Sequence, residues 1–148
     1  MISARDFLAL ADDWSRGRIE AEWRCAVSRA YYATFHECRS VLASLGLSVP
    51  RADLAHAFLW RRLENSKVAK LVSVGSDLGA LRRERNQADY DLHTTVTQST
   101  SLRAVASATK LLEALDSISS DEWNAATETM RTYERDVLRE QTWRNRPR

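Results

Sequence analysis

The chain has 148 residues, of which 44% are hydrophobic, and this size and content are typical of one domain with a buried core over residues 1–148. Its 22 basic and 20 acidic residues leave a net charge of +2, which excludes a general electrostatic attraction to nucleic acid or to an anionic membrane. Binding to either would need a local patch of charge.

The sequence begins without a signal-peptide pattern and has no stretch of about 18 apolar residues, so we expect a cytoplasmic protein without a membrane partner. The two cysteines, Cys25 and Cys38, should then be reduced. No spacing of cysteine and histidine matches a zinc site, and we expect neither a metal nor a cofactor.

Few residues interrupt helical stretches, because proline occurs only twice and glycine four times. A first helix should begin at Ser3, which forms a capping-box pattern with Asp6. A second, longer helix should cover residues 20–45 and end at Gly46 in a left-handed cap. A third, shorter helix follows Pro50.

The later helices carry an apolar residue every three or four positions. The apolar stripe of the fourth predicted helix continues through Arg85 to Leu92, although Gly75 could divide this helix into two pieces. Two further helices should cover residues 101–118 and 119–141. The pattern predicts an all-α fold, an antiparallel up-and-down helical bundle of about five to six helices. Residues expected on its buried faces include Leu10, Leu54, Leu102 and Val137.

Arg85 falls on the apolar stripe of its predicted helix. A guanidinium there must reach water, pair with a carboxylate or point into a polar cleft, because an unpaired buried charge is strongly unfavourable. Asp89 follows one turn later, so one interpretation is an intrahelical ion pair with a purely structural role. The other is that Arg85 points into a polar cleft, an interpretation that requires the side chain not to be sealed against Asp89.

The segment around Arg85 is dense in polar and titratable side chains for a helix that also buries one face. On a helical wheel Asn86, Tyr90 and His93 share one side, and Arg85 and Asp89 share the adjacent side, so together they could line a groove. The full set is Arg82, Arg83, Arg85, Asn86, Asp89, Tyr90, Asp91 and His93.

Two motifs resemble the HEPN superfamily, and more narrowly its small prokaryotic branch with an Arg-x-x-Ala-Asp-Tyr motif. The first is Ser-Arg-Ala-Tyr-Tyr-Ala-Thr-Phe-His at residues 28–36, and the second is Arg-Asn-Gln-Ala-Asp-Tyr at residues 85–90. The resemblance covers about residues 20–118 and implies a helical bundle that forms a homodimer, with the motif arginines of both copies facing a shared cleft. For Tyr31 and Tyr32, one interpretation is packing in the core and at the dimer interface with one hydroxyl satisfied, and the other is that they line the cleft.

Many HEPN proteins are metal-independent endoribonucleases that act as toxins, with a minimal nucleotidyltransferase as antitoxin, or as effectors of phage defence. Their nuclease motif is an arginine, a polar residue and a histidine four to six residues after the arginine. Arg85 and Asn86 match the first two, but Tyr90 occupies the place of the histidine. A phenol is a poor base at neutral pH, although it can act as an acid, and His93 could substitute as the base that deprotonates the ribose 2′-hydroxyl.

Three interpretations stay open. The first is a metal-independent ribonuclease; the second is a non-catalytic dimer that binds RNA, a nucleotide or a partner protein such as the nucleotidyltransferase, which could adenylylate Tyr90. The third is a helical scaffold with a structural Arg85–Asp89 pair. A basic tail over residues 139–148 is expected to be frayed and could contact RNA or simply be solvated. The candidate catalytic residues are Arg85, Asn86, Tyr90 and His93, and the candidate RNA contacts are Arg82, Arg83 and Asp89.

Overall fold

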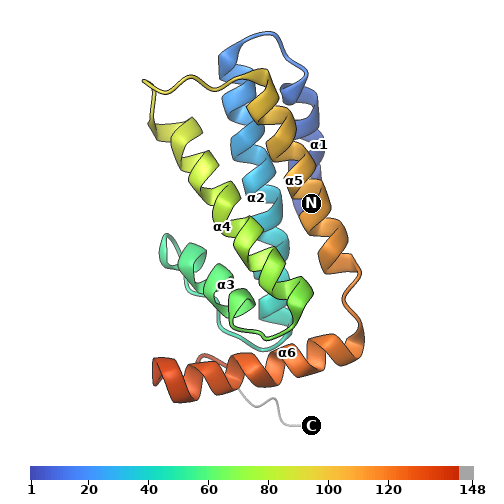
Figure 1. Cartoon of the computed structure of the whole chain (residues 1–148), viewed down its shortest axis with the longest axis vertical. Helices are drawn as coiled ribbons and strands as arrows, with labels where there is room; N and C mark the ends of the chain where they lie inside the picture. Colours follow the sequence, from blue (N-terminus) through green and yellow to red (C-terminus); the bar gives the residue numbers. More distant parts are fainter. Residues whose placement is uncertain (144–148) are drawn as a thin grey trace. The chain divides into compact units, whose positions relative to one another are not determined.

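The computed structural model describes residues 1–143, and every element in this range is helical, which confirms the predicted all-α helical bundle (Figure 1). Of the predicted basic tail, residues 144–148 lie outside the described range. Within residues 1–143, no helix combines the length and the apolar character needed to span a membrane. The helices are α1 (Ala4–Ser15), α2 (Glu20–Ser44), α3 (Leu54–Glu64), α4 (Ala69–Tyr90), α5 (Gln98–Asp116) and α6 (Ser120–Tyr133), followed by a π-helical turn, η1 (Glu134–Leu138).

The chain divides into two compact units. The first comprises residues 1–37 and 77–113, and the second comprises residues 38–76 and 114–143. Helices α2 and α4 therefore each contribute residues to both units. The prediction of one domain over the whole chain stays a prediction.

Side-chain contacts in the first unit show that α1 and α2 are antiparallel. Phe7, near the start of α1, stacks on His36 in the second half of α2, with 5.5 Å between the ring centroids. At the other end, the Trp23 indole donates to the carbonyl of Gly17, directly after α1, at 3.0 Å. The short connection between the helices explains this arrangement. The buried apolar residues of this unit include Ala11, Val27, Tyr31, Leu78, Leu81, Ala108 and Leu111.

Local hydrogen bonds mark the predicted starts of α1 and α6, and a backbone conformation marks the predicted end of α2. The Ser3 N–H donates to Asp6 Oδ2 at 2.6 Å, and the Glu122 N–H donates to Ser119 Oγ at 3.1 Å, so both predicted capping pairs are confirmed. Gly46 has a φ of 90°, the left-handed conformation that ends α2 as expected.

Several predicted details of the helices are wrong. Gly75 does not divide the fourth helix, and α4 ends at Tyr90, so that Leu92 lies beyond it and is exposed. Leu54 is exposed because it is the first residue of α3, and Val137 is exposed because η1 has π-helical rather than α-helical spacing. Leu10 and Leu102 are also exposed.

Gly75 and Gly79, one turn apart on α4, should respond oppositely to alanine. A Cβ at Gly75 would lie 3.0 Å from the backbone nitrogen of Glu64 and from Leu63 Cβ, so Gly75→Ala is expected to destabilise the fold by about 1–2 kcal/mol. At Gly79 the nearest atom is 3.7 Å away, so Gly79→Ala should stabilise the fold by about 0.5–1 kcal/mol. Urea denaturation of both variants measures the difference, and a stabilised Gly75→Ala variant would contradict the close packing of α3 on α4.

Candidate functional site

The two sequence motifs meet in the first unit. The Ser28 hydroxyl of α2 donates to Asp89 Oδ2 of α4 at 3.1 Å, and Arg85 Nη2 of α4 donates to the Tyr32 hydroxyl of α2. Because later residues of α2 contact earlier residues of α4, these two helices are antiparallel. The motifs are separated by more than 50 positions in the chain, and the fold joins them into one polar cluster.

The Arg85 guanidinium is at the centre of this cluster, and the residue as a whole is only 8% exposed. Nη1 donates to Asn86 Oδ1 at 2.6 Å, and Nε lies 3.2 Å from Asp89 Oδ2 without forming a hydrogen bond of good geometry. The guanidinium carbon also lies 5.0–5.6 Å from three aromatic ring centroids, distances at which the ring faces attract a cation. These rings belong to Tyr31, Tyr32 and Tyr90.

The Arg85 side chain stays positively charged in this environment. Burial alone lowers the pKa of Arg85, but the hydrogen bond to the Tyr32 hydroxyl and the electrostatic interactions with Tyr32, Tyr90 and Asp89 outweigh burial, so the pKa is raised. The i, i+4 pair that a purely structural role predicts is present. It is one of three polar contacts of Arg85, however. The two outer nitrogens, Nη1 and Nη2, donate to the neutral oxygens of Asn86 and Tyr32 rather than to a carboxylate.

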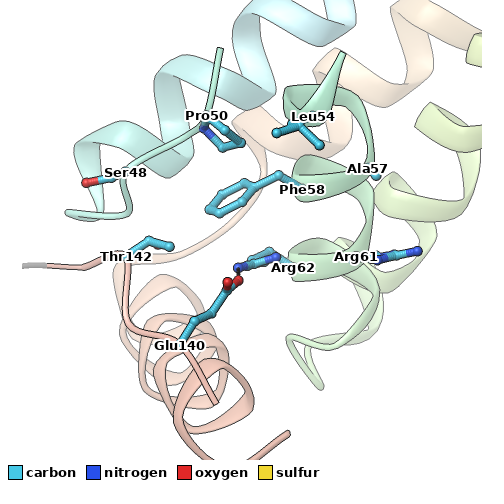
Figure 2. Close-up of a pocket in the computed structure, with 9 residues that line it drawn as sticks. All are labelled: Ser48, Pro50, Leu54, Ala57, Phe58, Arg61, Arg62, Glu140 and Thr142. Carbon is cyan, nitrogen blue, oxygen red and sulfur yellow. Dashed lines mark hydrogen bonds and ion pairs between the residues drawn. The ribbon is translucent and has the colours of Figure 1, made fainter. Parts of the chain in front are cut away.

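A second buried arginine, Arg62 in the second unit, provides a useful contrast (Figure 2). Its Nε and Nη2 donate to Glu134 Oε1 at 3.1 and 3.0 Å, and Nη2 also donates to Glu140 Oε1 at 2.8 Å. Its guanidinium carbon lies 3.8 Å from the ring centroid of Phe58. Two carboxylates therefore neutralise Arg62, whereas one partly exposed carboxylate lies against Arg85.

Arg62 lines a cavity of about 310 Å³ whose walls come from the segment after α2, from α3 and from the segment after η1. Figure 2 shows the Phe58 ring directed into this space and the Arg61 side chain directed away from it. Since both carboxylates already bind Arg62, this cavity has less positive charge to offer a phosphate than the cluster around Arg85.

The remaining predicted site residues are only partly brought together. Asn86 contacts Arg85 directly, and Tyr90 is 73% exposed with its ring beside the guanidinium. His93 does not share a helical side with Asn86 and Tyr90 as predicted, because α4 ends at Tyr90. Arg83 is exposed to solvent, and Arg82 is half-buried with its Nε unpaired among the described residues.

Asp91 organises the turn that carries His93. Its Oδ1 accepts the backbone N–H groups of His93 and Thr94 at 3.1 and 3.2 Å, and its Oδ2 accepts the Thr94 hydroxyl at 2.6 Å. The bond from the Thr94 hydroxyl, followed by that from the His93 N–H, lowers the pKa of Asp91. His93 is thus anchored by its backbone and exposed.

Sequence reasoning missed Arg24, which fixes the end of α4. Its Nη1 donates to the carbonyls of Ala88 and Asp91 at 2.8 and 3.0 Å, and its Nη2 donates to the carbonyl of Thr94. Glu20 orients Arg24 through a bond from Nε at 3.0 Å. The spacing of Glu20 and Arg24 indicates an intrahelical pair, but nothing in the sequence points to carbonyls 64–70 residues away.

Comparison with protein families matches residues 3–118 of the chain to the HEPN domain. The chain belongs to the HEPN family. The matched range of this HEPN domain contains Arg85 and all the contacts described for it, whereas Glu134 and Glu140, the partners of Arg62, lie beyond the range. A comparison with curated proteins and a comparison with solved structures each gave no match.

Proposed function

We propose that this HEPN protein acts on RNA, as a cytoplasmic homodimer in which the Arg85 side chains of both copies face a shared cleft. The observation that carries the proposal is the incomplete neutralisation of Arg85. Its one carboxylate partner, Asp89, is also bound by Ser28, and Nη1 and Nη2 each keep a second N–H without an acceptor among residues 1–143. Two N–H groups on a fixed guanidinium suit the oxygens of a phosphodiester.

The family membership supports a role as a toxin, paired with a minimal nucleotidyltransferase antitoxin, or in phage defence. In that setting the exposed Tyr90 hydroxyl is accessible for adenylylation by such a partner.

Metal-independent cleavage is a second candidate function, favoured by the position of Tyr90 against the Arg85 guanidinium. In this reaction a base, for which His93 is the candidate, removes the proton of a ribose 2′-hydroxyl. The 2′-oxygen then attacks phosphorus while the bond to the 5′-oxygen breaks, and Tyr90 protonates that leaving oxygen. Arg85 would stabilise the charge that develops on the phosphate, with Asn86 holding the guanidinium in place.

Incubation with labelled single-stranded RNA in EDTA tests both functions. We expect Arg85→Ala to weaken binding about 10- to 100-fold and to abolish any cleavage, because charge-assisted hydrogen bonds to phosphate are lost. Arg85→Lys should lie between wild type and Arg85→Ala, because lysine keeps the charge but not the planar fork. Arg51→Ala, a change at an exposed arginine of the second unit, is the control and should bind RNA as wild type does.

The outcomes separate the interpretations. RNA binding that depends on Arg85, without cleavage of the RNA, would support the non-catalytic binding module. Cleavage in EDTA that is lost when Tyr90 is substituted would support the nuclease. Equal binding by the wild type and Arg85→Ala, with Arg85→Ala folded by circular dichroism, would leave Arg85 as a structural residue. Sedimentation that shows a monomer at micromolar concentration would contradict the shared cleft.

A further inference from the structure

A second cavity of about 300 Å³ lies in the first unit, beside the Arg85 cluster. Its walls come from α1 and α2, and Asp89 of α4 belongs both to the cavity and to the cluster. A cavity of this size is at the lower end of the range for small-molecule sites, large enough for one nucleobase. A ligand that reaches Arg85 with a phosphate could therefore place an adjacent group in this cavity.

The aromatic residues of the cavity differ in how much ring surface they leave open. Phe7 is already stacked on His36 and lies 5.5 Å from the Arg29 guanidinium, so its ring is a fixed wall. Trp14 also lines the cavity, and its ring has no aromatic or cationic partner among the described residues. Unpaired bases stack on such rings and on arginine planes with little dependence on sequence.

Asp89 adds a hydrogen-bond acceptor to this aromatic surface. Its Oδ2 is engaged by the Ser28 hydroxyl and lies against Arg85 Nε, whereas Oδ1 has no donor among residues 1–143. The Asp89 side chain is 29% exposed, so that a ligand can reach it. A carboxylate oxygen accepts well from an exocyclic amino group, which adenine, cytosine and guanine carry and uracil lacks.

We propose that this cavity is a subsite for one unpaired base with an exocyclic amino group. Trp14 is the stacking surface, Asp89 Oδ1 accepts from the amino group, and the phosphate next to that base lies at Arg85. The 3.2 Å contact between Asp89 and Arg85 keeps the two subsites within the span of one nucleotide. This inference rests on the proposed action on RNA and adds the kind of base that is bound.

The first test uses the wild-type protein and short single-stranded RNAs in EDTA, with fluorescence anisotropy as the readout. A ten-nucleotide adenine RNA should bind at least about fivefold more tightly than a uracil RNA of the same length, which has the same number of phosphates. The same adenine RNA with purine, which lacks the amino group, in place of adenine should lose this advantage while its ability to stack is kept. Equal affinities for all three RNAs would overturn the subsite.

The second test locates the base. Cys25 lines the cavity and is exposed, whereas Cys38 is buried, so that alkylation reports on Cys25. A saturating adenine RNA should slow alkylation at least about fivefold, and Trp14→Leu should weaken the binding of adenine and uracil RNA alike, because both bases would stack on this ring. Tight binding without protection of Cys25 would place the base elsewhere.

Failure of the subsite differs from failure of the proposed function. Wild-type protein that binds RNA through Arg85 but shows no preference among bases rejects the subsite and keeps the function. Wild-type protein that binds none of the three RNAs rejects both. If Trp14→Leu does not fold by circular dichroism, the comparison of adenine with purine on the wild type decides the matter.

Discussion

Replacing Arg62 with methionine is expected to lower the free energy of unfolding by about 3–5 kcal/mol. The Arg62 and Glu134 side chains are 4% and 0% exposed, so removal of the cation leaves a buried carboxylate with no opposite charge. Glu134 also accepts the Thr142 N–H at 2.8 Å and the Thr142 hydroxyl at 2.7 Å, so the loss should reach the segment after η1. Guanidinium denaturation followed by circular dichroism measures the effect.

A double-mutant cycle shows whether the uncompensated charge is the cause. Glu134→Gln keeps the shape of the side chain, and the double variant with Arg62→Met and Glu134→Gln should be more stable than Arg62→Met alone. Arg135→Met is the control, because Arg135 pairs with Asp136 at an exposed position and its loss should cost far less stability than the loss of Arg62. A double variant no more stable than Arg62→Met would show that packing against Phe58 dominates.

Replacing Arg24 with methionine is expected to destabilise the fold by about 2–4 kcal/mol and to loosen the end of α4. Three carbonyls, those of Ala88, Asp91 and Thr94, lose a charged donor together. Hydrogen exchange should therefore accelerate most over residues 89–96, where Glu20 also loses the partner that helps to hold the Val96 N–H. The pKa of Glu20 is lowered first by that Val96 bond and then by Arg24, so Arg24→Met should raise it.

Arg16→Met provides a closely matched control for Arg24→Met. Arg16 also has a carboxylate four residues earlier, Asp12, at 3.1 Å, but both side chains are largely exposed. Its loss should change the stability by no more than about 0.5 kcal/mol. If both variants lose equally little stability, the contacts of Arg24 with the end of α4 contribute nothing measurable.

The sequence predicted the features that depend on short spacings. Three of these features join residues at most four positions apart: the capping pairs Ser3–Asp6 and Ser119–Glu122, and the intrahelical pair of Arg85 with Asp89. A fourth, the left-handed conformation of Gly46, depends on a single residue. The absence of strands over residues 1–143 followed from the same local signals.

What the sequence did not predict depends on contacts between distant segments. Tyr32 was expected either to pack in the core and at the dimer interface or to line the cleft, and its particular bond to Arg85 requires α2 and α4 to be antiparallel in one register. Arg24 binds carbonyls at the end of α4, and the helix ends at Tyr90, so that His93 lies beyond it. The presentation of Arg85 to a second copy of the chain stays a prediction.

The shared position of Asp89 between the cavity and Arg85 bears on which anions the site would select. A free sulfate or chloride ion that approaches the guanidinium also meets the negative charge of the carboxylate 3.2 Å from Nε, and it has no donor to satisfy that carboxylate. A nucleotide brings an anion and an amino group together, so the repulsion at one end is offset by a new hydrogen bond at the other. Asp89 would thus act as a filter against simple inorganic ions, which are abundant competitors of any phosphate-binding arginine.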